Sequence, residues 1–224
     1  MQLLDTEVAL QSLGALLAGL LVTIELTFII MLLSLVLAML VALAGMSRLA
    51  PVRWSIKAYI ELVRNTPALL QIVYIYFVLP EIGIRLDAWT AIIIAFTLNY
   101  SAYISEVYRG GIQAVSKGQH DSAAALGMGW MLAMRRIILP QAIRIVIPTL
   151  GNYFISLFKD TALASAVGIQ ELLYTSQIIS ARTYHYLTLY TMAGILYFAV
   201  CFPAARLVDY LERVSRRGYR RKRS

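Results

Sequence analysis

Long apolar runs dominate the chain, and short polar segments separate them. The runs cover residues 13–46, 60–80, 88–108, 141–160 and 187–209. A helix needs roughly 20 apolar residues to cross a bilayer, and each run reaches that length. Because every backbone amide and carbonyl must find a partner inside lipid, helices are the expected spanning element. The pattern predicts an all-α membrane protein with five transmembrane helices.

The second run is interrupted at Asn65-Thr66-Pro67. Proline has no amide hydrogen, so it leaves the carbonyl one turn back without its helical partner. Inside a membrane, such a break survives where it packs against protein or lines a wet cavity. Gln71 stands one turn beyond Pro67 on the same face. The break is therefore either part of a functional pathway or a packing kink.

Polar residues recur at helical spacing within other runs. The third run carries Asn99, Tyr103 and Glu106 at positions i, i+4 and i+7, and the fourth carries Asn152, Ser156 and Lys159 at the same spacing. Such residues share one face of a helix, which is expected to look into the bundle or a pathway rather than into lipid. Glu25 lies within the first run, where a charge costs on the order of 3 kcal/mol in lipid. It either lines a cavity or makes a helix–helix hydrogen bond when protonated.

A polar insert rich in small residues separates the third and fourth runs. It covers residues 118–140, GQHDSAAALGMGWMLAMRRIILP. Ser116 and Gln119 have the spacing of a capping box, which would open a short helix. Asp121 is expected in the first turn, where a negative charge suits the helix dipole. Gly127 fits a left-handed C-terminal cap.

The insert offers a flat surface to another protein. Ala123 and Ala124 give the short helix high propensity and a smooth face. A second short helix is expected from Trp130 to Leu139, ending at Pro140. A smooth helix that another protein's groove can approach closely favours a docking function, and an ordinary connector is the alternative.

The distribution of charge predicts the orientation. The 224 residues are 60% apolar and carry a net charge of +8. With the N-terminus outside and the C-terminus inside, 17 of the 20 Lys and Arg residues lie on the inner side, as the positive-inside rule predicts. The chain is then one transmembrane domain over residues 1–224, with a cytoplasmic loop at 110–140 and a basic cytoplasmic tail at 212–224. We interpret the tail as an orientation signal that contacts lipid headgroups, rather than as a nucleic-acid site.

The sequence offers little for catalysis or metal binding. Cys201 is the single cysteine, and His120 and His185 lack partners at metal-ligand spacing. No G-x-x-x-x-G-K-[ST] motif, nucleophile–base pair or cleaved signal peptide is recognisable. The chain is expected not to be an enzyme and to have no catalytic residue, metal site or bound cofactor. If ATP drives it, a partner must supply the ATPase.

Several motifs together resemble one family. Residues Gly118 to Gly127, GQHDSAAALG, followed by Ile137 and Leu139-Pro140, are similar to the cytoplasmic EAA loop of membrane subunits in ATP-binding-cassette (ABC) importers of the polar amino-acid branch. Asp121 replaces the usual Glu and Ser122 the first Ala, which keeps the charge sign and the small size. The resemblance extends to Arg64-Asn65-Thr66-Pro67, Glu106-x-x-Arg109-Gly110-Gly111, Leu139-Pro140-Gln141-Ala142 and Lys159-Asp160-Thr161.

The resemblance implies a permease subunit of a type I importer for polar amino acids in a bacterial cytoplasmic (inner) membrane. The implied partners are two ATPase subunits that hold ATP-Mg, an identical or homologous permease subunit, an extracytoplasmic amino-acid-binding protein and the lipid bilayer. The insert then resembles a coupling helix that sits in a cleft of the ATPase, through Gln119, Asp121, Ala123, Ala124 and Gly127. By the same resemblance, the substrate contacts are Thr66, Asn99, Ser101, Glu106 and Asp160.

Two other classes of function remain as alternatives. A proton- or ion-coupled secondary amino-acid carrier would use Glu25 or Glu106 as its proton site and need no ATPase. The absence of an inverted repeat and the presence of a docking insert argue against it. A non-transporting scaffold would only assemble partners, and polar stripes at membrane depth argue against that.

Overall fold

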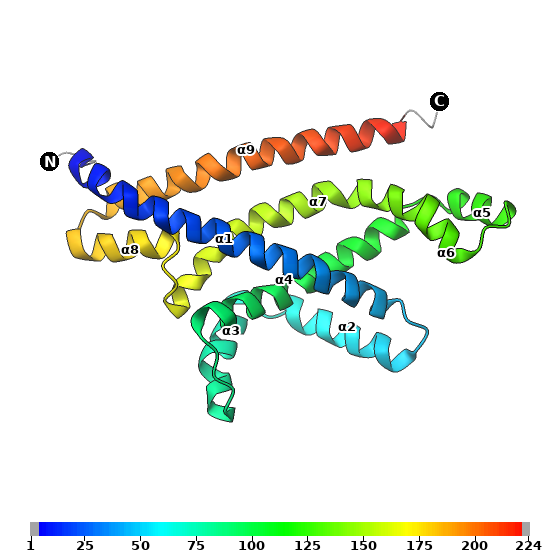
Figure 1. Ribbon diagram of the computed structural model, residues 1–224, viewed down its shortest axis with the longest axis horizontal. Coiled ribbons are helices and arrows are strands. Elements are labelled where there is room, and N and C mark those ends of the chain that lie inside the picture. The colour runs from blue at the N-terminus through cyan, green and yellow to red at the C-terminus, as the bar shows by residue number, and fades with distance from the viewer. Residues whose placement is uncertain (1–4, 221–224) are drawn as a thin grey trace.

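The computed structural model describes residues 5–220, which contain α-helices, 3₁₀ and π turns but no β-strand (Figure 1). The helices are α1 (Thr6–Gly45), α2 (Ala50–Arg64), α3 (Ala68–Val73), α4 (Ala88–Gln113), α5 (Lys117–Ala125), α6 (Trp130–Ala133), α7 (Leu139–Asp160), α8 (Leu172–Thr183) and α9 (Tyr186–Arg220). Two π-helical segments, Tyr74–Val78 and Met134–Ile138, and two 3₁₀ segments, Leu79–Ile82 and Thr161–Val167, extend or join them.

Length and composition identify three or four possible membrane spans among the described residues. Three are the helices α1, α4 and the part of α9 from Tyr186 to Val214. The fourth is the pair of α2 with Ala68–Ile82, which is bent by 105° at the predicted break. α7 covers the predicted span 141–160 and is 22 residues long, but it is less apolar than the others. The all-helical membrane architecture is thus confirmed, whereas these criteria do not yield five spans.

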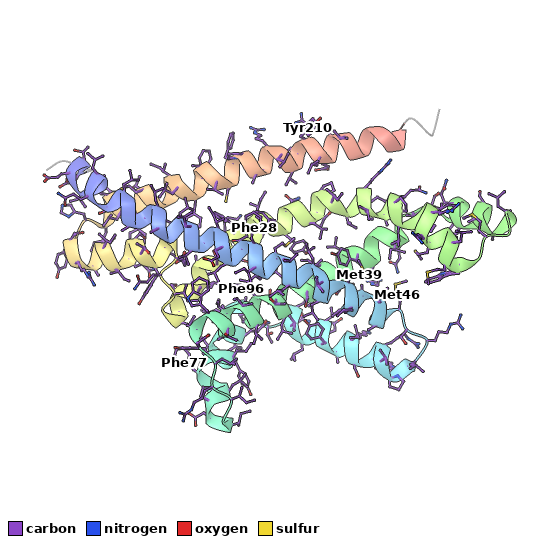
Figure 2. All side chains as sticks on the ribbon, in the orientation of Figure 1. Phe28, Met39, Met46, Phe77, Phe96 and Tyr210 are labelled. Carbon is purple, nitrogen blue, oxygen red and sulfur yellow. The ribbon has the colours of Figure 1, made fainter. Side chains whose placement is uncertain are left out.

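The long helices run along one axis of the molecule. Figure 1 shows α8 and the start of α1 at one end, and the α1–α2 turn, the insert and the end of α9 at the other. α1 has 40 residues and so measures about 60 Å. Its inner face contributes Leu26 and Ile30 to the core, where they meet Phe96 of α4 and Leu157 of α7. Many other large side chains face outward, including Phe28, Phe77 and Tyr210, which are labelled with Phe96 in Figure 2.

A buried carboxylate joins three helices at the α8 end. Glu171 caps α8 by accepting hydrogen bonds from the amides of Leu173 (2.9 Å) and Tyr174 (2.7 Å). It also accepts one from the Tyr197 hydroxyl of α9 (2.9 Å), and it is fully buried. α1 approaches α8 closely at Gly19, where a Cβ atom would lie 3.1 Å from the Glu171 backbone. A small residue permits such close packing of membrane helices.

The predicted break at residues 65–67 is confirmed. α2 ends at Arg64 and Pro67 precedes α3. The carbonyls that the break frees are satisfied by nearby polar groups: the Thr66 hydroxyl donates to the Leu62 carbonyl (2.9 Å), and the Gln71 amide donates to the Val63 carbonyl (2.9 Å). Side-chain partners of this kind make a broken helix tolerable at membrane depth.

The insert differs in part from its prediction. Ser116 precedes α5 but makes no side-chain cap bond, and Gln119 accepts a hydrogen bond from Gln141 (3.2 Å), so the predicted capping box is wrong. Asp121 is not in the first turn, because α5 already begins at Lys117. The left-handed cap is confirmed, since Gly127 has a φ of 69°. Its amide and the next one donate back into α5, which is the Schellman arrangement.

The second predicted helix of the insert does not end at Pro140. α6 passes through the π-helical segment Met134–Ile138 directly into α7. The Leu139 amide donates to the Met134 carbonyl, one residue further back than in an α-helix. Pro140 therefore occupies the first turn of α7, where an amide hydrogen is not required. The insert and α7 form one continuous helical path.

The last helix is longer than predicted. The apolar run 187–209 corresponds to α9, which continues to Arg220. The predicted basic tail 212–224 therefore begins within this helix, and its residues 221–224 lie outside the described part of the chain.

At the start of α4, Asp87 accepts hydrogen bonds from the Thr90 hydroxyl and amide, and these lower the pKa of Asp87.

Candidate functional site

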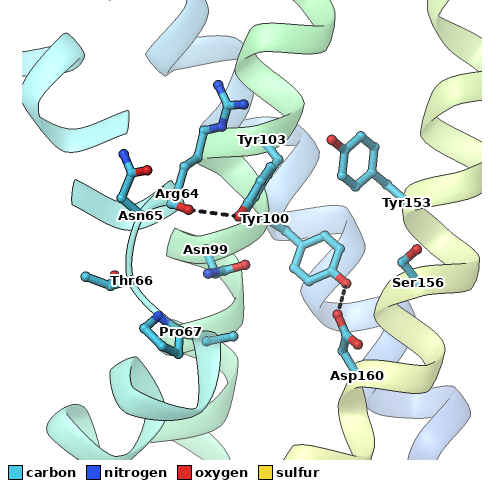
Figure 3. Close-up of a pocket in the computed structure, with 11 residues that line it drawn as sticks. Arg64, Asn65, Thr66, Pro67, Asn99, Tyr100, Tyr103, Tyr153, Ser156 and Asp160 are labelled. Carbon is cyan, nitrogen blue, oxygen red and sulfur yellow. Dashed lines mark hydrogen bonds between the residues drawn. The ribbon is translucent and has the colours of Figure 1, made fainter. Parts of the chain in front are cut away.

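A pocket of about 500 Å³ opens where the α2–α3 break faces α4 and α7 (Figure 3). Its lining is mostly polar or aromatic: Arg64, Asn65, Thr66, Pro67, Ala68, Asn99, Tyr100, Tyr103, Tyr153, Ser156 and Asp160. The break supplies the first five residues, α4 the next three and α7 the last three. Polar groups from three elements thus converge on one space of a size suited to a small molecule.

A carboxylate stands at the α7 side of the pocket. The Tyr100 hydroxyl donates to Asp160 Oδ2 at 2.6 Å, as Figure 3 shows. Asp160 Oδ1 has no hydrogen-bond partner among the described residues. The ring of Tyr153 packs against two tyrosines of α4: its centroid lies 6.2 Å from that of Tyr100 and 6.1 Å from that of Tyr103. Tyr100 orients the carboxylate and leaves one of its oxygens available to a ligand.

A guanidinium stands at the opposite side. Arg64 lies over the ring of Tyr103, 5.4 Å from its centroid, and the Tyr103 hydroxyl donates to the Arg64 carbonyl (3.3 Å). Among the described residues no carboxylate lies within ion-pair distance of Arg64. One anionic residue, Asp160, and one cationic residue, Arg64, thus line the same tyrosine-rich pocket. A zwitterionic ligand needs both kinds of charge-assisted partner.

A chain of polar side chains connects the break to α4. The Gln71 amide donates to the Thr66 hydroxyl (2.8 Å), and Gln71 Oε1 accepts from the Asn99 amide (3.1 Å). The side chain of Asn99 is buried. These bonds hold Thr66 and Asn99 on the same wall of the pocket.

The five predicted substrate contacts separate into two groups. Thr66, Asn99 and Asp160 line the pocket, and Ser101 and Glu106 do not. Ser101 is fully buried behind it, within 2.7 Å of the Tyr59 hydroxyl. Glu106 lies closer to the insert and is bound by the guanidinium of Arg109, a residue not on the pocket wall.

Sequence reasoning overlooked several lining residues. The sequence pattern does not distinguish Tyr100 and Tyr153, because a tyrosine in an apolar run is usually a packing or interfacial residue. On α7 the predicted polar face began at Asn152, whereas the pocket face runs from Tyr153 to Asp160. The spacing of Tyr153, Ser156 and Asp160, i, i+3 and i+7, is the signal that identifies this face.

The insert presents a second candidate surface, far from α8 in Figure 1. Asp121, Ala124 and Gly127 are exposed, Gln119 is half-buried, and Ala123 is buried and takes no part in the surface. The surface is not flat as predicted, because three large apolar side chains project from it: Leu126 is 77% exposed, Trp130 66% and Met131 69%. Exposed apolar side chains on a polar segment make it a candidate for contact with another protein or with the membrane.

The described residues contain no group of three or more His, Cys, Asp or Glu side chains that is suited to a metal ion. The pocket contacts are hydrogen bonds, charges and aromatic faces, which suit recognition of a ligand rather than its chemical conversion.

Comparisons with known proteins give one consistent result. The family described as "Binding-protein-dependent transport system inner membrane component" matches residues 34–217. The probable amino-acid ABC transporter permease protein YckA of Bacillus subtilis (strain 168) is 39% identical over 209 residues, which cover 93% of this chain and 92% of that protein. The L-cystine transport system permease protein TcyB of the same organism is 39% identical over 87% of this chain and 84% of its own. A solved crystal structure of an amino acid ABC transporter with histidines has a TM-score of 0.90 at 36% identity, covering 94% of this chain and 98% of that one.

Proposed function

The chain belongs to the family of binding-protein-dependent transport system inner membrane components, and we propose on this basis that it is the permease subunit of an ATP-driven importer for polar amino acids. The observation that carries the proposal is the pocket with Asp160 at one side and Arg64 at the other. An amino acid brings an ammonium and a carboxylate, which pair with these two groups, while Thr66 and Asn99 accept or donate hydrogen bonds along the wall.

The proposed topology has five spans: α1, the broken pair α2–α3, α4, α7 and α9. The α1–α2 turn, the insert and the end of α9 share one end of the molecule. Most Lys and Arg residues belong to that end, which the positive-inside rule assigns to the cytoplasm. The N-terminus and α8 then lie on the outer side.

Two ATPase subunits are the proposed partners of the insert, and they hold the ATP-Mg that this chain has no motif to bind. A second permease subunit, identical or homologous, completes the pathway, and an extracytoplasmic amino-acid-binding protein delivers the substrate. Family membership supports these partners, and the exposed apolar side chains of the insert fit the first of them. The whole assembly is placed in a bacterial cytoplasmic membrane.

The continuous path from insert to pocket suggests how ATP hydrolysis reaches the substrate. α6 leads through the π-helical segment Met134–Ile138 into α7, which carries Tyr153, Ser156 and Asp160. A rigid-body push on the insert therefore displaces one wall of the pocket against α4. Ser101 and Glu106, the other two predicted contacts, act in this scheme from behind the pocket and on its cytoplasmic side.

The test is ATP hydrolysis by the complex of this chain with its ATPase, reconstituted with the amino-acid-binding protein and screened across amino acids. The expected result is stimulation by a subset of polar amino acids, with uptake that requires ATP. Uptake driven by a proton or ion gradient without ATP would support the secondary-carrier alternative and overturn the proposal.

A further inference from the structure

A second pocket, of about 490 Å³, lies between α2 and the C-terminal half of α4, beside the α1–α2 turn. The function proposed above gives a role to two of its residues, Arg64, which lines both pockets, and Glu106, and leaves the pocket itself without one. Its charged side chains are four cations, Arg53, Lys57, Arg64 and Arg109, and two carboxylates, Glu61 and Glu106. Four positive against two negative charges leave a net formal charge of +2 within one cavity.

One ion pair cancels, and three cations have no ion-pair partner among the described residues. Arg109 binds Glu106 through Nε (3.0 Å) and through a second guanidinium nitrogen. Arg53 donates to the carbonyls of Ser47 (3.1 Å) and Arg48 (2.9 Å), which fixes its position without neutralising it.

Lys57 is a second uncompensated cation. Its ammonium lies 5.7 Å from the centre of the Trp54 ring, and no carboxylate of the described residues lies within ion-pair distance of it. Arg64 also has no ion-pair partner among the described residues, so the pocket holds three such cations on α2 against one remaining carboxylate, Glu61. Arg53 and Lys57 lie at positions i and i+4 of one helical face. This arrangement is suited to an anion.

The pocket lies at the depth of lipid headgroups. The Tyr108 hydroxyl contacts the Leu35 carbonyl at 3.5 Å, so the neighbouring part of α4 is level with the last turns of α1. The ten residue steps from Leu35 to Gly45 span about 15 Å at the end of that long apolar helix. Trp54 is 68% exposed beside the pocket, and Leu49 is exposed near it. Tryptophan beside exposed apolar residues is typical of the membrane–water boundary.

We propose that this pocket binds the phosphate of an anionic phospholipid headgroup. Lys57 and Arg53 pair with the phosphate oxygens, and the ring of Trp54 packs against the glycerol and the first acyl carbons. Basic pockets between membrane helices bind anionic headgroups by this combination of charge and apolar contact. A soluble phosphate would make no contact with the exposed apolar rim, whereas the acyl chains of a lipid would. A lipid is therefore the favoured source of the phosphate. The bound lipid would hold α2, whose last residue Arg64 stands in the substrate pocket.

Trp54 permits a direct test with the full-length chain in proteoliposomes. Replacing Trp89 and Trp130 by Phe leaves Trp54 as the one tryptophan of the three. Its fluorescence is then measured with equal fractions of dibrominated phosphatidylglycerol or dibrominated phosphatidylcholine, both of which quench tryptophan on contact. The expected result is stronger quenching by the anionic lipid. The variant Lys57→Gln should reduce that preference about fivefold, the effect of one cation near an anionic surface.

Two further variants separate a site from diffuse attraction. Arg48→Gln removes the same charge at the same end but outside the pocket, and it should leave the preference unchanged. Lys57→Arg keeps the charge and should retain it. Equal quenching by the two lipids, or equal losses in Lys57→Gln and Arg48→Gln, would overturn the proposal. Relief of the quenching by excess inorganic phosphate would assign the pocket to a soluble anion instead of a lipid. All of these readouts are independent of transport.

Discussion

In the pocket between the α2–α3 break, α4 and α7, the polar side chains bond to one another across three elements, whereas in the insert apolar side chains face outward. Tyr100 reaches from α4 to Asp160 at the end of α7, and Asn99 is bonded to Gln71 of α3. On the insert, by contrast, Leu126 and Trp130 are largely exposed. The first region is held by bonds within the chain, and we propose that the second becomes an interface when an ATPase covers it.

The difference shows where each kind of function can be studied. The side chains of a pocket that are already oriented lose little conformational entropy when a ligand binds. Variants of these side chains should therefore change substrate affinity and uptake. An exposed apolar surface contributes free energy only when another protein covers it, so its variants should act through that partner. Three variants test this contrast, and a fourth, Glu171→Ala, tests the stability of the fold that holds both regions; they follow from the largest expected effect to the smallest.

Glu171→Ala should have the largest effect, because the carboxylate is fully buried. Its loss leaves the amides of Leu173 and Tyr174 and the hydroxyl of Tyr197 without their acceptor, which should cost about 3 kcal/mol of stability. Thermal unfolding of the purified chain in detergent measures the loss. Glu7→Ala, an exposed carboxylate on α1, is the control and should unfold at the parental temperature. Equal unfolding temperatures for all three proteins would show that the buried network contributes nothing.

Asp160→Asn should come next, and it acts on uptake rather than on folding. The neutral amide still accepts the Tyr100 hydrogen bond but carries no negative charge to pair with an ammonium. Uptake should therefore fall about 10- to 100-fold. Tyr100→Phe keeps the charge and removes the hydroxyl, and it should cause a smaller loss. Basal ATP hydrolysis by the complex should be unaffected in both. If Asp160→Asn transports normally, the pocket does not hold the substrate's ammonium.

Gly127→Ala tests the insert itself. A Cβ atom meets no neighbour there, but the φ of 69° is left-handed and should cost about 1–2 kcal/mol for alanine. The expected result is a several-fold fall in substrate transported per ATP hydrolysed, with unchanged membrane insertion; a bulkier residue should uncouple transport further. Gly129→Ala is the matched control, because that glycine has an ordinary φ and open space. The same loss in both variants would contradict a special role for the left-handed turn.

Gln119→Ala should have the smallest effect. The side chain accepts one hydrogen bond from Gln141 at the partly exposed base of the insert, worth about 0.5 kcal/mol or less. Transport per ATP should decrease by less than about twofold, consistent with that energy. His120→Ala, its exposed neighbour, provides the baseline. A loss as large as that of Gly127→Ala would indicate that this bond, rather than the cap, transmits the push.

Much of the fold is predictable because its causes are local. The length of an apolar run predicts a membrane helix, and this placed α1, α4 and α9. Proline's missing amide predicted the break before α3, and glycine's tolerance of a left-handed conformation predicted the cap after α5. Pro140 shows the limit of such reasoning, since one wide turn before it moves the proline into the first turn of α7, where it is harmless.

The membership of the pocket is less predictable, because it depends on which face of each helix looks inward. Asn99 and Ser101 are two residues apart, about 200° around a helix, so one packing arrangement cannot bring both to the same pocket. Glu106 shares the face of Asn99 but lies about 10 Å further along α4. On α7 the polar spacing predicted a face that begins at Asn152, but the face that packs toward the pocket begins one residue later, at Tyr153.

The central claim is that the insert receives work from an ATPase on the cytoplasmic side. It is tested most directly by cross-linking the variant Ala124→Cys, in a chain where Cys201 is replaced by Ser, to the co-purified ATPase subunit. A cross-link, together with protection of this cysteine from a membrane-impermeant reagent in intact cells, is the predicted result. Tyr184→Cys, at the exposed α8–α9 turn, should be labelled by the reagent from outside the cell and should not cross-link to the ATPase subunit. Labelling of Ala124→Cys from outside the cell, or no cross-link in an active complex, would contradict the account.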